Sequence, residues 1–111
     1  MKKWQVTISE PAEADLDEIY TYITETLLEP VTAWHQIARI REAVLGLDEM
    51  PERGSLLPDE PWRSRGLRRL LVDNYTIIYE IQETADTVVV IAILYSRRNL
   101  NEALSQEENQ W

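Results

Sequence analysis

The stretch LRRLLVDNYTIIYEIQETADTVVVIAILY, residues 67–95, decides the fold. It contains three strand-like runs, at about 67–72, 75–82 and 87–95, rich in the β-branched and aromatic residues that favour strands. Asp73-Asn74 and the segment 83–86 separate the runs, and both have the composition of turns. Such short turns between consecutive strands predict an antiparallel meander.

The residues before this stretch add one strand and two helices. Positions 4–9 alternate between apolar and polar side chains, which is the pattern of a half-buried strand. Ser9-Glu10-Pro11 combines a capping hydroxyl with an early proline, and apolar residues at helical spacing continue from there to Leu27. Pro30 opens a second helix, whose apolar stripe ends at Leu47. The very short link between the two predicts an antiparallel helical hairpin.

The predicted element order is therefore β-α-α-β-β-β. This order is typical of an α+β fold, a two-layer sandwich in which the helical hairpin packs on a mainly antiparallel sheet. Residues 51–66 hold three prolines and two glycines and are expected to form a loop with little regular structure. We expect the loop and the arginines to occupy the other face of the sheet. The length of 111 residues suits a single domain, placed at residues 1–98, and the polar tail 99–111 is expected to be partly helical or disordered.

Composition narrows the function classes. The formal net charge is −9, and residues 1–50 hold four basic against ten acidic side chains, so long-range attraction to nucleic acid is unfavourable. Four acids of the first helix are expected to face solvent: Glu13, Asp15, Asp17 and Glu18. The chain has no cysteine, one histidine, no Gly-rich phosphate loop and no HExxH motif, so neither a metal site nor a cofactor is expected. Without cysteine, a signal peptide or a long apolar run, we expect a cytoplasmic protein that makes no membrane contact.

Seven of the eleven basic residues are arginines that fall in two places. They are Arg53, Arg63, Arg65, Arg68 and Arg69, then Arg97 and Arg98. Guanidinium grips phosphate or carboxylate with two prongs, so we expect an anion or a partner to bind Arg63, Arg65, Arg68 and Arg98. The alternative is a surface strand whose charges blunt a sheet edge, with Arg68 and Arg69 on opposite faces. Trp62 joins the binding candidates because an indole in a loop needs either the core or a partner.

Four segments, taken in order, form a recognisable set. They are SEPAEADLDEI at 9–19, MPERG at 50–54, GLRRLLVDNYTIIY at 66–79 and ILYSRR at 93–98. With these segments and this element order, residues 4–98 resemble the RelE/ParE superfamily of toxins from bacterial type II toxin–antitoxin systems, which includes plasmid stabilisation proteins. The resemblance implies the same β-α-α-β-β-β sandwich that the periodicity indicates.

The resemblance implies one of two actions. RelE-like members cut mRNA in the ribosomal A site without a metal, and ParE-like members poison DNA gyrase and are not known as nucleases. If the chain is an enzyme, the first action makes it a metal-independent mRNA endonuclease. Its implied catalytic residues are then Arg69 and Arg97, which hold the scissile phosphate, and Tyr95, which takes part in proton transfer. Tyr79 matches a strand tyrosine that is usually structural.

Two departures from the RNA-cutting members favour the ParE-like action. Those members typically carry an arginine three residues before the matching tyrosine, where this chain has Thr76. They also tend to be basic, and this chain is acidic. The prediction is therefore a toxin that inhibits growth by binding gyrase. An mRNA endonuclease and an inactive relative that only binds antitoxin are the alternatives.

The resemblance also implies a partner, a co-expressed antitoxin that wraps the toxin. We expect its chain to dock along the helices and the sheet, over apolar edges near Trp34 and Trp62. Antitoxin carboxylates would then occupy the arginines. Reversing the charges of Arg68 and Arg69 together is expected to weaken antitoxin binding.

Overall fold

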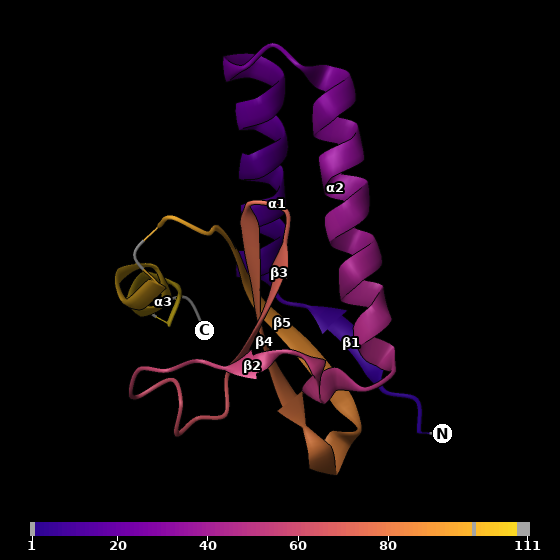
Figure 1. The fold of residues 1–111 in the computed structure, drawn as a ribbon, viewed down its shortest axis with the longest axis vertical. Coiled ribbons are helices and arrows are strands. Elements are labelled where there is room, and N and C mark those ends of the chain that lie inside the picture. The colour runs from indigo at the N-terminus through magenta and orange to yellow at the C-terminus, as the bar shows by residue number, and fades with distance from the viewer. Residues whose placement is uncertain (1, 99, 109–111) are drawn as a thin grey trace.

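The structure is a computed structural model that describes residues 2–98 and 100–108, without the side chains of 101 and 106–108. Its strands and helices follow the predicted order and add a short strand and a final helix (Figure 1). The elements are β1 Gln5–Ile8, α1 Glu10–Thr21, α2 Pro30–Leu45, β2 Ser55–Leu56, β3 Arg68–Val72, β4 Tyr75–Gln82, β5 Thr87–Tyr95 and α3 Leu100–Glu108. Among the described residues, no helix is long and apolar enough to cross a membrane.

The five strands form one sheet in the order β1-β5-β4-β3-β2. The predicted meander β3-β4-β5 is antiparallel throughout, and only the pair of β1 with β5 is parallel. The α+β class and the mainly antiparallel sheet are thus confirmed. The two-residue strand β2, which the loop composition did not indicate, pairs with the start of β3.

The helical hairpin forms as predicted and stands on one face of the sheet (Figure 1). The Ser9 hydroxyl oxygen accepts a hydrogen bond from the backbone nitrogen of Ala12 at 3.3 Å, which satisfies one of the free N–H groups of the first turn. The middle of α2 is bonded to the sheet at the turn between β3 and β4. There, one carboxylate oxygen of Asp73 accepts hydrogen bonds from Arg39 at 2.8 Å and from Gln36 at 2.9 Å.

The hairpin ends in an unusual turn. Residues Tyr22–Thr26 form a π-helical turn, in which the backbone nitrogen of Leu27 donates to the carbonyl of Tyr22 at 3.1 Å. Leu28 follows in the left-handed conformation with φ 57°, and Glu29 bonds back to Ile23. A bulky residue is costly in this conformation, for which glycine is the usual choice.

The sheet separates two apolar clusters. The hairpin-side core contains Ala12, Leu16, Ile40, Val44, Leu47, Ile77, Tyr79, Val88, Val90 and Ile93. The α3-side core contains Leu57, Trp62, Leu67, Ile78, Ile91, Ala92, Leu94, Ala103 and Leu104. The second face was expected to hold the loop and the arginines, but helix α3 and the apolar side chains of the loop cover part of it.

Candidate functional site

The arginines of β3 lie on opposite faces of the sheet, as strand alternation predicts. Arg68 pairs with Tyr79, a residue of the hairpin-side core, and Arg69 pairs with Ile78, a residue of the α3-side core. The two guanidinium groups therefore start from opposite sides of the strand. They cannot act as one grip without a large change in direction.

Arg68 is engaged by its own chain. Its Nη1 donates to the carbonyl oxygens of Gly54 at 2.7 Å and Glu52 at 3.3 Å. Arg53 is held in the same way, because its Nη2 donates to the carbonyls of Gly46 at 2.8 Å and Glu49 at 2.6 Å. Both arginines thus fix the path of the chain between α2 and β2. The role of Arg68 in binding an anion stays a prediction, and such binding would compete with these internal bonds.

Tyr79 also holds the segment between α2 and β2. Its hydroxyl donates to the carbonyl of Pro51 at 2.6 Å and accepts from the backbone nitrogen of Gly54 at 2.9 Å. The side chain is fully buried, and burial raises the pKa of its hydroxyl above the ordinary value. Tyr79 is therefore a neutral structural donor and acceptor, in agreement with the structural role that the resemblance implies.

Of the two loop arginines, Arg65 contacts Trp62. Trp62 is only 3% exposed and packs in the α3-side core, so its indole is not a surface for a partner, contrary to expectation. The Arg65 guanidinium lies 5.5 Å from the centre of the indole ring, a cation–π contact. Arg63 is exposed in the turn where the Glu60 carboxylate accepts hydrogen bonds from Ser64. Those bonds lower the pKa of Glu60 below its ordinary value.

The implied catalytic set does not come together on one face. Tyr95 pairs with Tyr75, and their rings meet edge to face on the hairpin side with centroids 5.9 Å apart. Arg69 is on the other face, in line with Ala92, three residues before Tyr95. Three residues of strand add about 10 Å. Arg97 is exposed in the turn that follows β5, nearer to Tyr95 than to Arg69 along the sheet.

Thr76 also faces the α3 side and is 3% exposed. Its hydroxyl oxygen lies 2.9 Å from the hydroxyl oxygen of Ser96, and the two groups satisfy each other. A neutral hydroxyl pair therefore occupies the position at which the resemblance implies an arginine in RNA-cutting members.

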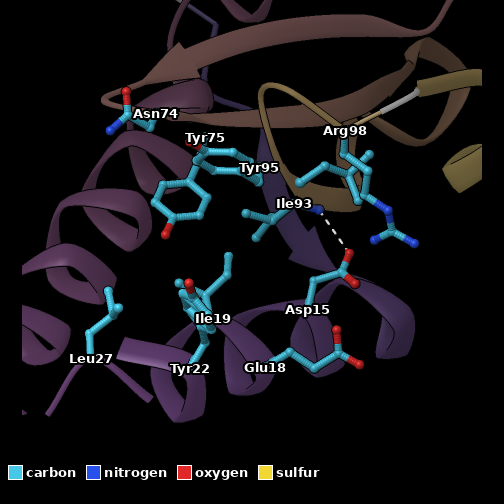
Figure 2. A pocket seen from close by; sticks show the side chains of 11 residues that line it. Asp15, Glu18, Ile19, Tyr22, Leu27, Asn74, Tyr75, Ile93, Tyr95 and Arg98 are labelled. Carbon is cyan, nitrogen blue, oxygen red and sulfur yellow. Dashed lines mark hydrogen bonds between the residues drawn. The ribbon is translucent and has the colours of Figure 1, made fainter. Parts of the chain in front are cut away.

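A pocket of about 570 Å³ opens between the hairpin and the ends of β4 and β5 (Figure 2). Figure 2 shows α1 and the π-helical turn along one wall and two tyrosine rings on the opposite wall. The lining residues are Asp15, Glu18, Ile19, Tyr22, Leu27, Asn74, Tyr75, Ile93, Leu94, Tyr95 and Arg98. Burial, together with the neighbouring Tyr95 and Tyr22 hydroxyls, raises the pKa of Tyr75 above its ordinary value, so its phenol is neutral at neutral pH.

One pocket carboxylate has a structural duty. Asp15 is 8% exposed, and its Oδ2 accepts from the backbone nitrogen of Ile93 at 2.9 Å. Strand β1 pairs with β5 only as far as Val90, so the edge of β5 beyond that point needs other partners. Ser9 bonds to the carbonyl of Ile91 at 3.2 Å, and Asp15 bonds two residues further on. Side chains of the first helix and its cap thus bond to the edge of β5 beyond the point where β1 ends. This corrects the expectation that Asp15 faces solvent.

The pocket was missed because its residues had separate explanations in the sequence. Asp15 and Glu18 are among the four acids of the first helix that were expected to face solvent, and Tyr22 was not among the candidate site residues. Their spacing of three and four along α1 is a usable signal, because such residues share one helical face. Of the site residues that were predicted, only Tyr95 and Arg98 line this pocket.

The family model described as ParE toxin of type II toxin-antitoxin system, parDE, matches residues 6–100. No curated protein sequence matches the chain.

Solved structures share the fold. A structure of the chromosomal ParDE toxin–antitoxin system from P. aeruginosa has a TM-score of 0.68 and 23% identity over 84% of this chain and 96% of that chain. The RelBE2 toxin–antitoxin complex of Mycobacterium tuberculosis has a TM-score of 0.64 and 23% identity, covering 86% and 93%. The isolated E. coli RelE toxin has a TM-score of 0.57 and 13% identity, covering 96% and 98%.

Proposed function

The chain belongs to the ParE toxin family of type II toxin–antitoxin systems, and we propose that it arrests growth by binding DNA gyrase rather than by cutting RNA. The proposal treats the protein as an inhibitor whose surface, not a reactive centre, carries the activity. It requires neither a metal nor a cofactor.

The hydroxyl pair formed by buried Thr76 and exposed Ser96 is the observation that carries this proposal. An RNA cutter must stabilise the negative charge that develops on the scissile phosphate, and fixed cationic donors are the usual means. Here two neutral hydroxyls 2.9 Å apart satisfy one another in a position that is 3% exposed at Thr76. They offer no charge to a phosphate.

The separation of the implied catalytic groups supports the same proposal. Proton transfer and phosphate stabilisation require groups within hydrogen-bonding reach of one substrate. Arg69 and Tyr95 start from opposite faces of the sheet and are offset by three residues along it. Tyr75, beside Tyr95, has a pKa raised above its ordinary value by burial, so at neutral pH it is protonated and supplies no phenolate base.

We further propose that a cognate antitoxin silences the toxin. The similar structures of the ParDE system and of the RelBE2 complex are assemblies of a toxin with an antitoxin. Several exposed apolar side chains lie at and near the hairpin tip, where they give an antitoxin a surface to bury. They include Leu27, Leu28, Val31 and Trp34.

Two assays on the purified toxin separate the proposal from its alternatives. Gyrase supercoiling of a relaxed plasmid should fall as toxin is added and recover when the cognate antitoxin is added. Primer extension on translated mRNA should show intact message. Cuts that vanish in Arg69→Ala would establish the mRNA endonuclease instead, and normal growth under strong induction without antitoxin would establish the inactive relative.

A further inference from the structure

The pocket between α1 and β5 has the chemistry of a site for a cationic side chain. Tyr22, Tyr75 and Tyr95 contribute aromatic rings, and Glu18 contributes a carboxylate at the rim (Figure 2). Ring faces attract Lys and Arg, and a nearby carboxylate adds an ionic hydrogen bond. The same wall carries Ile19 and Leu27, against which the aliphatic stem of such a side chain packs.

Of the two carboxylates that line the pocket, that of Glu18 is the one that can accept a hydrogen bond from a ligand. Asp15 is already committed to the backbone nitrogen of Ile93 at 2.9 Å. Glu18 is exposed, and within the part of the chain that the structure describes its carboxylate has neither a hydrogen bond nor an ion pair. Arg98 lies at the end of the pocket beside Asp15, which leaves Glu18 as the pocket carboxylate for an incoming cation (Figure 2).

The occupant is a protein segment rather than a small cation. A volume of about 570 Å³ exceeds one basic side chain and leaves room for an adjoining apolar one. The pocket also continues into exposed apolar surface at the hairpin tip, where Leu27 is 51% and Leu28 is 77% exposed. An amphipathic segment fits both parts, with its apolar residues on the tip and its basic residue in the pocket.

The net negative charge of residues 1–50 favours a partner with positive charge. Residues 1–50 carry four basic and ten acidic side chains, a balance of 4 − 10 = −6. A basic segment is attracted to this surface, and an acidic one is repelled. We propose that the pocket receives a lysine or arginine side chain from an amphipathic segment of the antitoxin, an inference that rests on the antitoxin partnership proposed above.

The test measures the affinity of the full-length cognate antitoxin for the full-length toxin and for matched variants. Glu18→Gln removes the charge of Glu18 from the pocket. Glu25→Gln removes one charge from an exposed position of the π-helical turn that does not line the pocket. Tyr22→Leu removes a pocket ring, and Tyr20→Leu removes an exposed ring outside it. All four positions are exposed, so the fold should be kept, and circular dichroism checks it.

We expect Glu18→Gln and Tyr22→Leu each to weaken the complex about three- to tenfold, and the Glu25 and Tyr20 controls less than about twofold. The loss from Glu18→Gln should shrink in high salt. Substituting each antitoxin lysine and arginine by methionine should identify one residue whose effect is not additive with Glu18→Gln.

Equal affinities for the pocket variants and their controls, with the wild-type complex intact, overturn this inference and leave the proposed function standing. A wild-type toxin that does not bind its antitoxin overturns the inference together with the proposed antitoxin partnership. Unchanged antitoxin affinity, combined with weaker gyrase inhibition by Glu18→Gln, also overturns the inference, because it assigns the pocket to the target.

Discussion

The hydroxyl group of Tyr79 lies 2.9 Å from the backbone nitrogen of Gly54, which donates to it across the underside of the loop. The same hydroxyl donates to Pro51 at 2.6 Å, so one buried side chain holds both ends of the short turn Pro51–Arg53. Arg53, at the end of this turn, and Arg68 of β3 bind further carbonyls of the same region. The segment between α2 and β2 is therefore fixed by side-chain bonds from Tyr79, Arg53 and Arg68.

Removing the Tyr79 hydroxyl should destabilise the protein strongly. Tyr79→Phe leaves the Gly54 N–H and the Pro51 carbonyl without their partner in a buried place. Each unsatisfied buried group costs about 1 to 3 kcal/mol, so we expect a loss of about 2 to 4 kcal/mol in the free energy of unfolding. Urea unfolding measures it. Tyr20→Phe, at an exposed position, is the control and should change little.

Gly54 should tolerate no side chain. A Cβ at this position would overlap the Tyr79 hydroxyl and lie 2.5 Å from the carbonyl oxygen of Arg69. Gly54→Ala should therefore cost about 3 kcal/mol or more, because neither neighbour can move freely. Gly46→Ala is a matched control, since its nearest atom lies at 3.7 Å and its φ of −65° suits alanine. Equal unfolding midpoints for the two variants would contradict the steric explanation.

Asp15 should contribute more to stability than the other acids of α1. Asp15→Ala leaves the backbone nitrogen of Ile93 without its acceptor at the unpaired edge of β5, at a cost of about 1.5 to 3 kcal/mol. Asp15→Asn keeps a carbonyl acceptor and should cost less. Asp17→Ala, at an exposed position, should stay within about 0.5 kcal/mol of wild type. A smaller loss for Asp15→Ala than for Asp15→Asn would be inconsistent with this bond.

The Asp73 contact should make stability depend on pH. The hydrogen bond from Arg39, then that from Gln36, lowers the pKa of Asp73 below its ordinary value of 3.8. Because the folded-state pKa is the lower one, the contribution is complete above the unfolded-state pKa and is lost as pH falls through the folded-state pKa. Asp73→Asn keeps a residue that tolerates the positive φ of 55°.

The urea midpoints of wild type and Asp73→Asn, measured across pH, test this coupling. Their difference should be constant from neutral pH to about pH 4 and should vanish below that. A difference that grows on acidification would mean that the pKa of Asp73 is raised rather than lowered.

Leu28 should be replaceable by glycine with a gain in stability. Its φ of 57° is a conformation that costs an ordinary L-residue about 1 to 2 kcal/mol, and its side chain is 77% exposed. Glycine loses more chain entropy on folding, so the net gain for Leu28→Gly should be up to about 1 kcal/mol. Leu28→Ala separates the two effects, since it removes the side chain but keeps the strain. If both variants unfold at the same midpoint, backbone strain is not the cause.

The meander and the hairpin were predictable because their signals are local. Turn residues such as Asp73, strand-forming runs and a helical stripe each act within a few positions of one another. The opposite faces of Arg68 and Arg69 follow from the same alternation. These features needed no knowledge of what lies across the sheet.

The pocket and the loop anchor were not predictable because they depend on contacts between distant residues. In the sequence, Asp15 is an ordinary acid of a helix. Its role depends on the backbone nitrogen of Ile93, 78 positions away, which β1 does not reach. From the sequence, the Trp62 indole could pack in the core or contact a partner. It packs in the core, because α3 and the loop cover the second face of the sheet. The π-helical turn that brings Tyr22 and Leu27 to the pocket has no distinct sequence pattern.

The parallel pair of β1 with β5 sets the order in which this protein can be completed during synthesis. Gln5 pairs with Thr87 and Ile8 with Val90, so the first strand waits for almost the whole chain before it has a neighbour. Until then the apolar stripe of the hairpin has no sheet to cover, and pairings so distant in sequence form slowly. A chain with this topology therefore gains its complete sheet only after β5 has been made.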